Sequence, residues 1–282
     1  MTLPNLFVAG AQKSGTTALH GFLASHPEIH FPNGTQEIHF FDVDDNFARG
    51  IGWYERFFDG WQGERYVAQT SPLYMYVPAA PGRIAALAPD ARFVFILRNP
   101  IDRAYSHYWH EVRYGWETLP FAEALACEEG RLARGFDARR HFSYVDRGRY
   151  AHQITRYLDH FPRERIHIEI SEGFARDPVS AGRRCARFLG LDAAGFDGAE
   201  AAGLRRNQAM LPRWLRLQRW GRRLHDRAPR LYAALELVNV RRAAYPPLEP
   251  SIRVQLAERL RDDVAALTAL CGLDPSCWSD FA

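Results

Sequence analysis

A glycine-bearing loop near the N-terminus constrains the fold of this chain more than any other feature. The loop runs from Gly10 to Thr17, after the apolar residues 6–9 and before apolar residues at helical spacing up to Leu23. It therefore joins a buried strand to the start of a helix. Glycines allow a tight turn there, and the unpaired N–H groups and dipole of the helix favour an anion. We expect the loop to bind a phosphate.

The loop also carries the only lysine of the chain, Lys13, although lysine and arginine together number 36. Lysine places a compact charge on a flexible stem, whereas arginine would impose a planar fork. The alternative is a surface lysine beside an ordinary turn. Because Lys13 precedes the second glycine, the pattern G-x-x-x-x-G-K-[ST] is absent, which disfavours a nucleoside triphosphatase.

A second candidate for phosphate binding lies where the apolar run 93–97 ends in Arg98. Pro100 fits the first turn of a helix, so the chain can pass directly from strand to helix. Ser106 and His110 then share one face of that helix. Arg98 and Ser106 can converge on one anion, as expected above the strand ends of an open α/β sheet. The alternatives are an ion-paired arginine, a serine bonded to its own backbone and a partly buried histidine.

Strand and helix patterns alternate along the chain. Strands are predicted at residues 6–9, 65–68, 93–97 and 165–170, and helices at 148–161, 177–190 and 252–271. The alternation predicts an α/β fold of the P-loop-like kind, a mostly parallel sheet flanked by helices. We expect one domain over residues 1–282, with an α/β core over about residues 1–200 and a helical C-terminal extension over about residues 205–282.

The extension begins with an arginine-rich segment. Its arginines include Arg205, Arg206, Arg213, Arg216, Arg219, Arg222, Arg223, Arg227 and Arg230. Trp214, Leu217, Trp220 and Leu224 recur among them at the spacing of an amphipathic basic helix. Such a helix covers the core with a solvated face, binds an acidic acceptor such as an anionic glycan or lipid, or binds nucleic acid.

Four segments resemble, in order and spacing, the sulfotransferases that use 3′-phosphoadenosine 5′-phosphosulfate (PAPS). They are residues 12–19 (QKSGTTAL), 36–42 (QEIHFFD), 93–110 (FVFILRNP and the helix after it) and 241–247 (RRAAYPP). The first is most similar to the sulfotransferase domains of heparan sulfate enzymes and their bacterial relatives. The chain is therefore identified as a member of this family.

The resemblance implies a role for each matching residue. Lys13 would stabilise the leaving phosphate, and Ser14, Gly15, Thr16 and Thr17 would cradle it. Glu37 would be the catalytic base, assisted by His110; His39, which would share a face with Glu37 if the segment is extended, ranks below it. Arg98 and Ser106 would hold the 3′-phosphate, and the loop containing Arg241 and Arg242 would close over the nucleotide.

The expected reaction transfers a sulfuryl group from PAPS to a hydroxyl or amine of a glycan, glycolipid or secondary metabolite, leaving 3′,5′-adenosine bisphosphate (PAP). Such transfer requires in-line orientation, removal of the acceptor proton and neutralisation of the leaving phosphate. No metal is required. The alternatives are a kinase-like phosphotransferase and a non-enzymatic binder of polyanions or membrane surfaces.

Composition sets the remaining expectations. The net charge of +3 and pI near 8.7 suit a polyanionic nucleotide. No signal region and no membrane span are evident, so we expect a cytoplasmic protein. The arginine and alanine bias indicates a bacterial genome. The cysteines lack metal-binding spacing, so no metal site is expected. The expected partner is a glycan or small-molecule acceptor and not a nucleic acid.

Overall fold

The computed structural model describes residues 2–32, 37–196, 209–225 and 227–282. Two compact units divide the chain. The first comprises Met1–Arg98 and Ala151–Asn207, and the second comprises Asn99–Tyr150 and Gln208–Ala282. The single domain expected from the sequence stays a prediction, and Arg205 and Arg206 lie outside the described residues.

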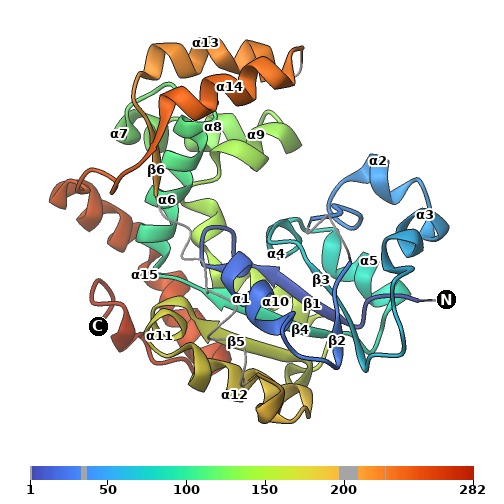
Figure 1. Cartoon of the computed structure of the whole chain (residues 1–282). Coiled ribbons are helices and arrows are strands. Elements are labelled where there is room, and N and C mark those ends of the chain that lie inside the picture. The colour runs from blue at the N-terminus through green and yellow to red at the C-terminus, as the bar shows by residue number, and fades with distance from the viewer. Residues whose placement is uncertain (1, 33–36, 197–208, 226) are drawn as a thin grey trace. The chain divides into compact units, whose positions relative to one another are not determined.

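A parallel five-stranded sheet forms the centre of the first unit, in the order β2-β3-β1-β4-β5 (Figure 1). Its strands are β1 (Leu6–Gly10), β2 (Ile29–His30), β3 (Tyr66–Thr70), β4 (Arg92–Leu97) and β5 (Ile166–Ile170). The helices of this unit are α1 (Thr16–Leu23), α2 (Asp44–Phe47), α3 (Ile51–Glu55), α4 (Leu73–Tyr76), α5 (Ala80–Leu87), α10 (Tyr150–Leu158), α11 (Ser171–Arg176) and α12 (Pro178–Leu189). The predicted α/β fold is confirmed.

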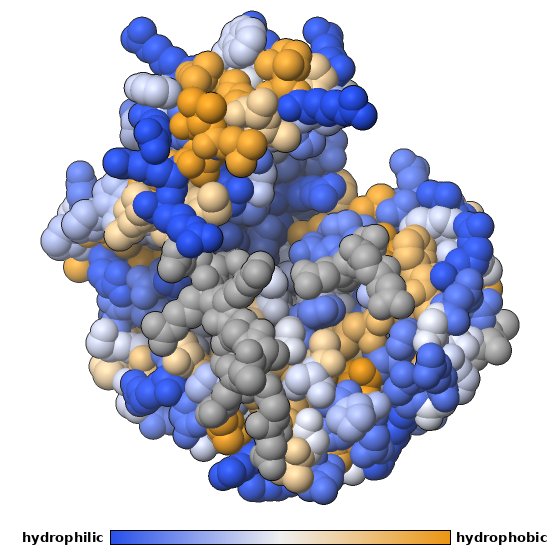
Figure 2. Space-filling model, viewed as in Figure 1, coloured by the Kyte–Doolittle hydropathy of each residue, from blue (hydrophilic) through white to orange (hydrophobic). Residues whose placement is uncertain are grey.

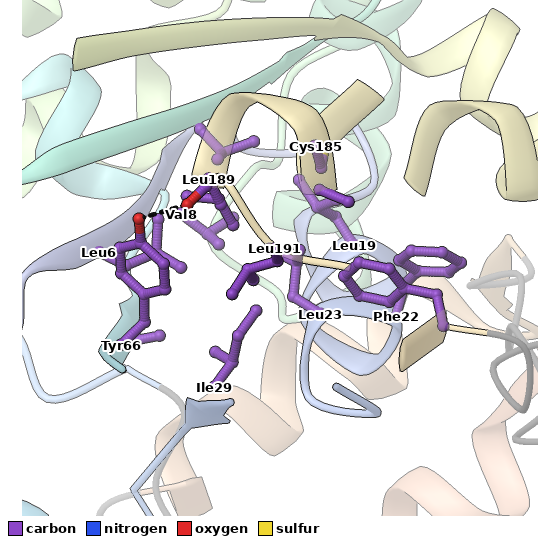
Figure 3. Close-up of a cluster of buried hydrophobic side chains, with 14 of the residues drawn as sticks. Leu6, Val8, Leu19, Phe22, Leu23, Ile29, Tyr66, Cys185, Leu189 and Leu191 are labelled. Atoms are coloured by element: carbon purple, nitrogen blue, oxygen red, sulfur yellow. Dashed lines mark hydrogen bonds between the residues drawn. The ribbon is translucent and has the colours of Figure 1, made fainter. Parts of the chain in front are cut away.

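Apolar residues cover both faces of this sheet, as parallel strands require. On one face, Leu6 and Val8 pack with side chains of α1 and α12 in a buried cluster (Figure 3). The Tyr66 hydroxyl donates a hydrogen bond to the Leu189 carbonyl at 2.7 Å in this cluster. On the other face, Phe7 stacks on Phe93 at 5.6 Å between ring centroids. The central strand β1 is thus buried along its whole length.

Helix α12 shows how local sequence sets the boundaries of an element. The Asp177 side chain accepts a hydrogen bond from the Ser180 N–H at the first turn, and Pro178 supplies a fitting φ. Gly190 ends the helix in the left-handed conformation at φ 65°. Both boundaries agree with the sequence prediction.

Helix α6 (Pro100–Arg113) is the core element of the second unit. It packs against α15 (Pro250–Cys271) through a buried cluster that includes Ile101, Leu256 and Leu260. The other elements are α7 (Phe121–Ala126), α8 (Glu128–Leu132), α9 (Phe136–Phe142), β6 (Met210–Pro212), α13 (Leu215–His225), α14 (Pro229–Asn239) and β7 (Val240–Arg242). No described helix is both long and apolar enough to span a bilayer.

The start of α6 is held by a polar cluster. The Asn99 side chain accepts a hydrogen bond from the Ile101 N–H at 3.0 Å and donates one to Asp280 at 2.7 Å. The Arg253 guanidinium pairs with Asp102 on α6 and with Asp280. Burial alone would raise the pKa of Asp280, but hydrogen bonds from Arg253 and Asn99 outweigh burial and lower it.

Gly182→Ala should destabilise the first unit. An added Cβ would lie 2.0 Å from the ring of Phe22, which is itself enclosed in the core. We expect a loss of about 1–3 kcal/mol in the free energy of unfolding, measured by urea denaturation. Gly21→Ala is the control, because the space beside that helical glycine is open, and it should add about 0.5–1 kcal/mol. Equal stability of the two variants would contradict the packing described.

Asp280→Asn should change how stability depends on pH. A carboxyl whose pKa is lowered by folding stabilises the fold above its ordinary pKa, and that stabilisation is lost as the pH falls through the folded value. We expect the variant to be about 1–2 kcal/mol less stable at pH 7, since the hydrogen bonds from the charged Arg253 are weakened. The difference from wild type should shrink below about pH 4. Asp262→Asn, at an exposed position of α15, should show no such trend.

Candidate active site

The loop between β1 and α1 is tightly turned and fixed to the sheet. Its backbone has positive φ at Lys13 (68°) and Gly15 (107°), and the Ala11 N–H donates to the Ile96 carbonyl on β4 at 2.8 Å. Gly10 tolerates no side chain, since a Cβ there would lie 2.6 Å from that of Met75. The half-buried Lys13 therefore extends from a defined backbone.

The loop is suited to an anion. The first N–H groups of α1 have no acceptor within the helix. Ser14 is 1% exposed, and its hydroxyl has no hydrogen-bond partner among the described residues. A buried hydroxyl without a partner is unfavourable, which points to a ligand atom as its partner.

Arg98 lies beside this loop. It follows the last residue of β4, the neighbour of β1 in the sheet, and its guanidinium approaches the Lys13 carbonyl at 3.5 Å. Two cationic side chains thus come from adjacent strand ends. The carboxyl ends of parallel strands meet at one edge, which is why the sequence could place them together.

Glu37 belongs to a segment anchored on the sheet by aromatic side chains. Phe40 and Phe41 are buried, and the Phe40 N–H donates to the Tyr74 hydroxyl at 3.2 Å. That hydroxyl donates in turn to Gln69 on β3 at 3.1 Å. The neighbouring Gln36 lies outside the described residues.

His39 links two carboxylates. Its Nδ1 lies 2.7 Å from the buried Asp42, and its Nε2 lies 3.4 Å from Glu37, whose side chain is 46% exposed. The extended segment on which a shared face depended does not form, because His39 has a positive φ of 56° and the chain turns there. The turn itself brings the imidazole between the carboxylates. The sequence pattern did not indicate the Asp42 contact, because that contact depends on this turn.

The second unit carries the other predicted site residues. Ser106 is buried and His110 is half-buried on α6, and the His110 ring contacts Tyr114 at 4.8 Å. Arg241 and Arg242 are exposed.

The expectation that these two arginines belong to a loop is wrong. They lie in β7, which pairs antiparallel with β6 in the register Leu211 to Arg241 and Met210 to Arg242. Successive side chains of a strand point to opposite faces, so the two guanidinium groups diverge. The following segment docks on α6, where Tyr245 stacks on Trp109 at 5.9 Å.

One further cluster combines possible metal ligands. Ligand atoms of His167, Glu169 and Cys185 lie within 4.8 Å of one another. However, Arg184 donates two hydrogen bonds to Glu169, and burial raises the pKa of the Cys185 thiol. The cluster is therefore an ion-paired link between β5 and α12.

A lysine-bearing loop and an arginine at adjacent strand ends define a phosphate-binding α/β enzyme. Residues 3–203 match the family described as the sulfotransferase domain. The chain belongs to the sulfotransferase family. The predicted class, a PAPS-dependent sulfotransferase, is thereby confirmed.

Similar proteins agree with this assignment. A crystal structure of a sulfotransferase from Alicyclobacillus acidocaldarius is 32% identical, with a TM-score of 0.74 over 99% of this chain and 100% of that chain. The human bifunctional heparan sulfate N-deacetylase/N-sulfotransferase 3 is 33% identical over 196 residues. The mouse heparan sulfate glucosamine 3-O-sulfotransferase 5 is 30% identical over 193 residues. Each match covers 67% of this chain, but only 22% and 54% of these two relatives.

Asp42→Asn should impair sulfuryl transfer without weakening nucleotide binding. The amide keeps the size of the side chain but removes the negative charge beside His39, which contacts Glu37. We expect kcat, measured from the formation of PAP, to fall by about tenfold or more. The affinity for PAP should stay within about twofold of the wild-type value. Asp44→Asn is the matched control, because Asp44 is exposed and its ion-pair partner in the described part of the chain is Arg83. An unchanged kcat in Asp42→Asn would exclude a role for the His39 contact.

Proposed function

We propose that this enzyme transfers a sulfuryl group from PAPS to a hydroxyl or amine of a glycan, glycolipid or secondary metabolite. The observation that carries the proposal is the buried Ser14 hydroxyl without a partner in the described residues, set in a loop between Lys13 and the N-terminus of α1. Arg98 at the edge of the same loop adds a second cation. Together they suit a nucleotide that carries two phosphate groups.

The residues of the first unit fit the phosphosulfate end of the nucleotide. PAPS, when bound, would supply an electrophilic sulfuryl group and a leaving phosphate. Lys13 would neutralise the charge that develops on the phosphate oxygens, and Ser14, with the N–H groups of Gly15, Thr16 and Thr17, would hold them. Arg98 would bind the 3′-phosphate in a bidentate manner.

Glu37 is the proposed base. Its half-exposed carboxylate is open to an acceptor and would take the proton from the hydroxyl or amine. His39, held by the buried Asp42, would keep the Glu37 carboxylate oriented. This arrangement restrains the base at Oε2, the oxygen that faces His39.

We assign further roles to residues of the second unit. Ser106 would donate its hydroxyl to the 3′-phosphate, and His110 would assist at the acceptor. Since Arg241 and Arg242 point to opposite faces of β7, only one of them would contact the nucleotide. Docking of Tyr245 on α6 supports this assignment, because it fixes the segment beside the helix that carries Ser106.

The names of the relatives favour a sugar as the acceptor. They include an N-sulfotransferase and a 3-O-sulfotransferase of heparan sulfate. The chain spans about a fifth to a half of their lengths, so their substrates are a starting point for a screen. Aminosugar-containing glycans, in which both an amine and hydroxyls are available, are the first acceptors to test.

Calorimetric titration with PAP tests the proposal. We expect tight binding of PAP and weak binding of 5′-AMP and ATP, since only PAP carries the 3′-phosphate. Arg98→Ala should lose most of the preference for PAP over 5′-AMP. Lys13→Ala should retain that preference but lower the transfer rate about 10²–10³-fold. Lys13→Arg should not restore the rate, because the planar fork differs from an ammonium.

A control variant distinguishes the loss of a specific binding residue from the loss of any one positive charge. Arg187→Ala removes an exposed arginine of α12 in the same unit and should bind PAP as the wild type does. If the protein prefers ATP, a kinase-like phosphotransferase replaces the proposal. If neither nucleotide binds the folded protein, the proposed nucleotide site at Ser14 and Arg98 is excluded.

A further inference from the structure

Helices α13 and α14 form an antiparallel pair that displays apolar side chains to solvent. We name the segment 213–239 the basic hairpin. Its exposed large apolar residues are Trp214, Leu215, Trp220, Leu231, Leu237 and Val238, with exposed fractions from 45% to 86%. Figure 2 shows orange side chains gathered over the region of α13 and α14, bordered by blue side chains. Most exposed large apolar residues of the described chain thus lie in one small element.

A buried network of polar side chains fills the space between α13 and α14, which leaves the apolar side chains exposed. The Asn239 amide donates to Gln218 at 2.8 Å, and Gln218 donates to the Tyr232 hydroxyl at 3.2 Å. The Asn239 side chain also accepts from the Trp214 N–H at 2.9 Å. At Gly221 the two helices approach so closely that a Cβ would lie 2.8 Å from Leu235. Because the inner face is closely packed and its polar side chains are hydrogen-bonded to one another, Trp220 and Leu237 remain on the outer face.

The sequence pattern fits this observation only in part. The predicted basic helix forms as α13, but Trp214 and Trp220 are 56% and 55% exposed and do not join its inner face. Gln218 and Gly221 occupy that face.

Arginines surround the exposed apolar residues. Arg216 and Arg223 lie four residues before and three residues after Trp220, so they share its helix face. Arg213, Arg227 and Arg230 are exposed at the ends of the two helices. Arg219 is engaged within the unit, where it donates to the Thr118 carbonyl. The basic hairpin therefore combines positive charge and apolar side chains on one exposed surface.

We propose that the basic hairpin docks the enzyme on the surface of a membrane that contains anionic lipids. Trp and aliphatic side chains enter the boundary between headgroups and acyl chains, while arginines pair with the lipid phosphates. Long arginine stems can lie along the apolar zone with their charged ends at the headgroups. This inference does not depend on the sulfotransferase reaction.

Two other occupants fit the surface less well. A soluble polyanion would engage the arginines but would leave Leu231, Leu237 and Val238 in water. A second copy of the chain would place this positively charged surface against an identical positively charged surface across a two-fold axis. A lipid surface satisfies both the charge and the apolar residues.

The test is co-sedimentation of the full chain with vesicles. Binding should be strong with vesicles of phosphatidylcholine and phosphatidylglycerol, weak with phosphatidylcholine alone, and reduced but not abolished by salt. The double variant Leu231→Ser/Leu237→Ser and the double variant Arg216→Gln/Arg223→Gln should each weaken binding by about tenfold or more. Matched controls on α15 are Val254→Ser, an exposed aliphatic residue, and Arg261→Gln, an exposed arginine. Both should bind vesicles as the wild type does.

Each contrary outcome overturns the proposal. Binding to heparin that the serine substitutions leave unchanged, without binding to anionic vesicles, would identify a site for soluble polyanions. A dimer in sedimentation equilibrium that the serine substitutions dissociate, with no vesicle binding, would identify a self-association surface. Far-UV circular dichroism and urea denaturation of the same variants keep the result interpretable, since unchanged curves show that they are folded.

Discussion

Hydrogen bonds on both sides of β1 are the constraint on which the candidate site depends. Ala11 is bonded to β4 through the Ile96 carbonyl, and Ser71 is bonded to β1 through the Val8 carbonyl. The loop that follows β1 is therefore held at the centre of a parallel sheet, where the helix start and neighbouring strand ends come together. Its anion-binding character follows from this position, because charge and unpaired donors are gathered before any ligand arrives.

The same sheet also orients the proposed base, although through side chains. Phe40 stacks on Tyr54 at 4.3 Å, and Phe41 meets Tyr74 edge to face at 5.5 Å. These rings fill the space between the turn and the sheet, and Tyr74 carries the hydrogen bond from the backbone of that turn. The half-exposed Glu37 carboxylate therefore belongs to a segment that packed aromatic rings hold against the sheet. The arrangement reconciles openness to an acceptor with the fixed geometry that proton transfer requires.

Patterns that depend on near neighbours in sequence were predictable. The apolar runs gave β1, β3, β4 and β5, and parallel strands explain why Arg98 meets the Lys13 loop. Features that depend on residues far away in the sequence could not be predicted. A strand of two residues such as β2 has too short a pattern to detect, and β7 exists because Met210–Pro212 pairs with it. Likewise, no local signal sets His39 at a positive φ, so its contact with Asp42 could not be foreseen.

The polar cluster at the start of α6 joins residues that are far apart in the sequence and are therefore synthesised at different times. Asn99 and Asp280 are separated by 181 positions, and Arg253 of the same cluster also follows Asn99 by more than half of the chain. During synthesis, the contacts of Asn99 with Asp280 and of Asp102 with Arg253 therefore form only after α15 and the segment that follows it have been made. The cluster that holds the start of the helix carrying Ser106 and His110 therefore closes late, after all five strands of the sheet have been made.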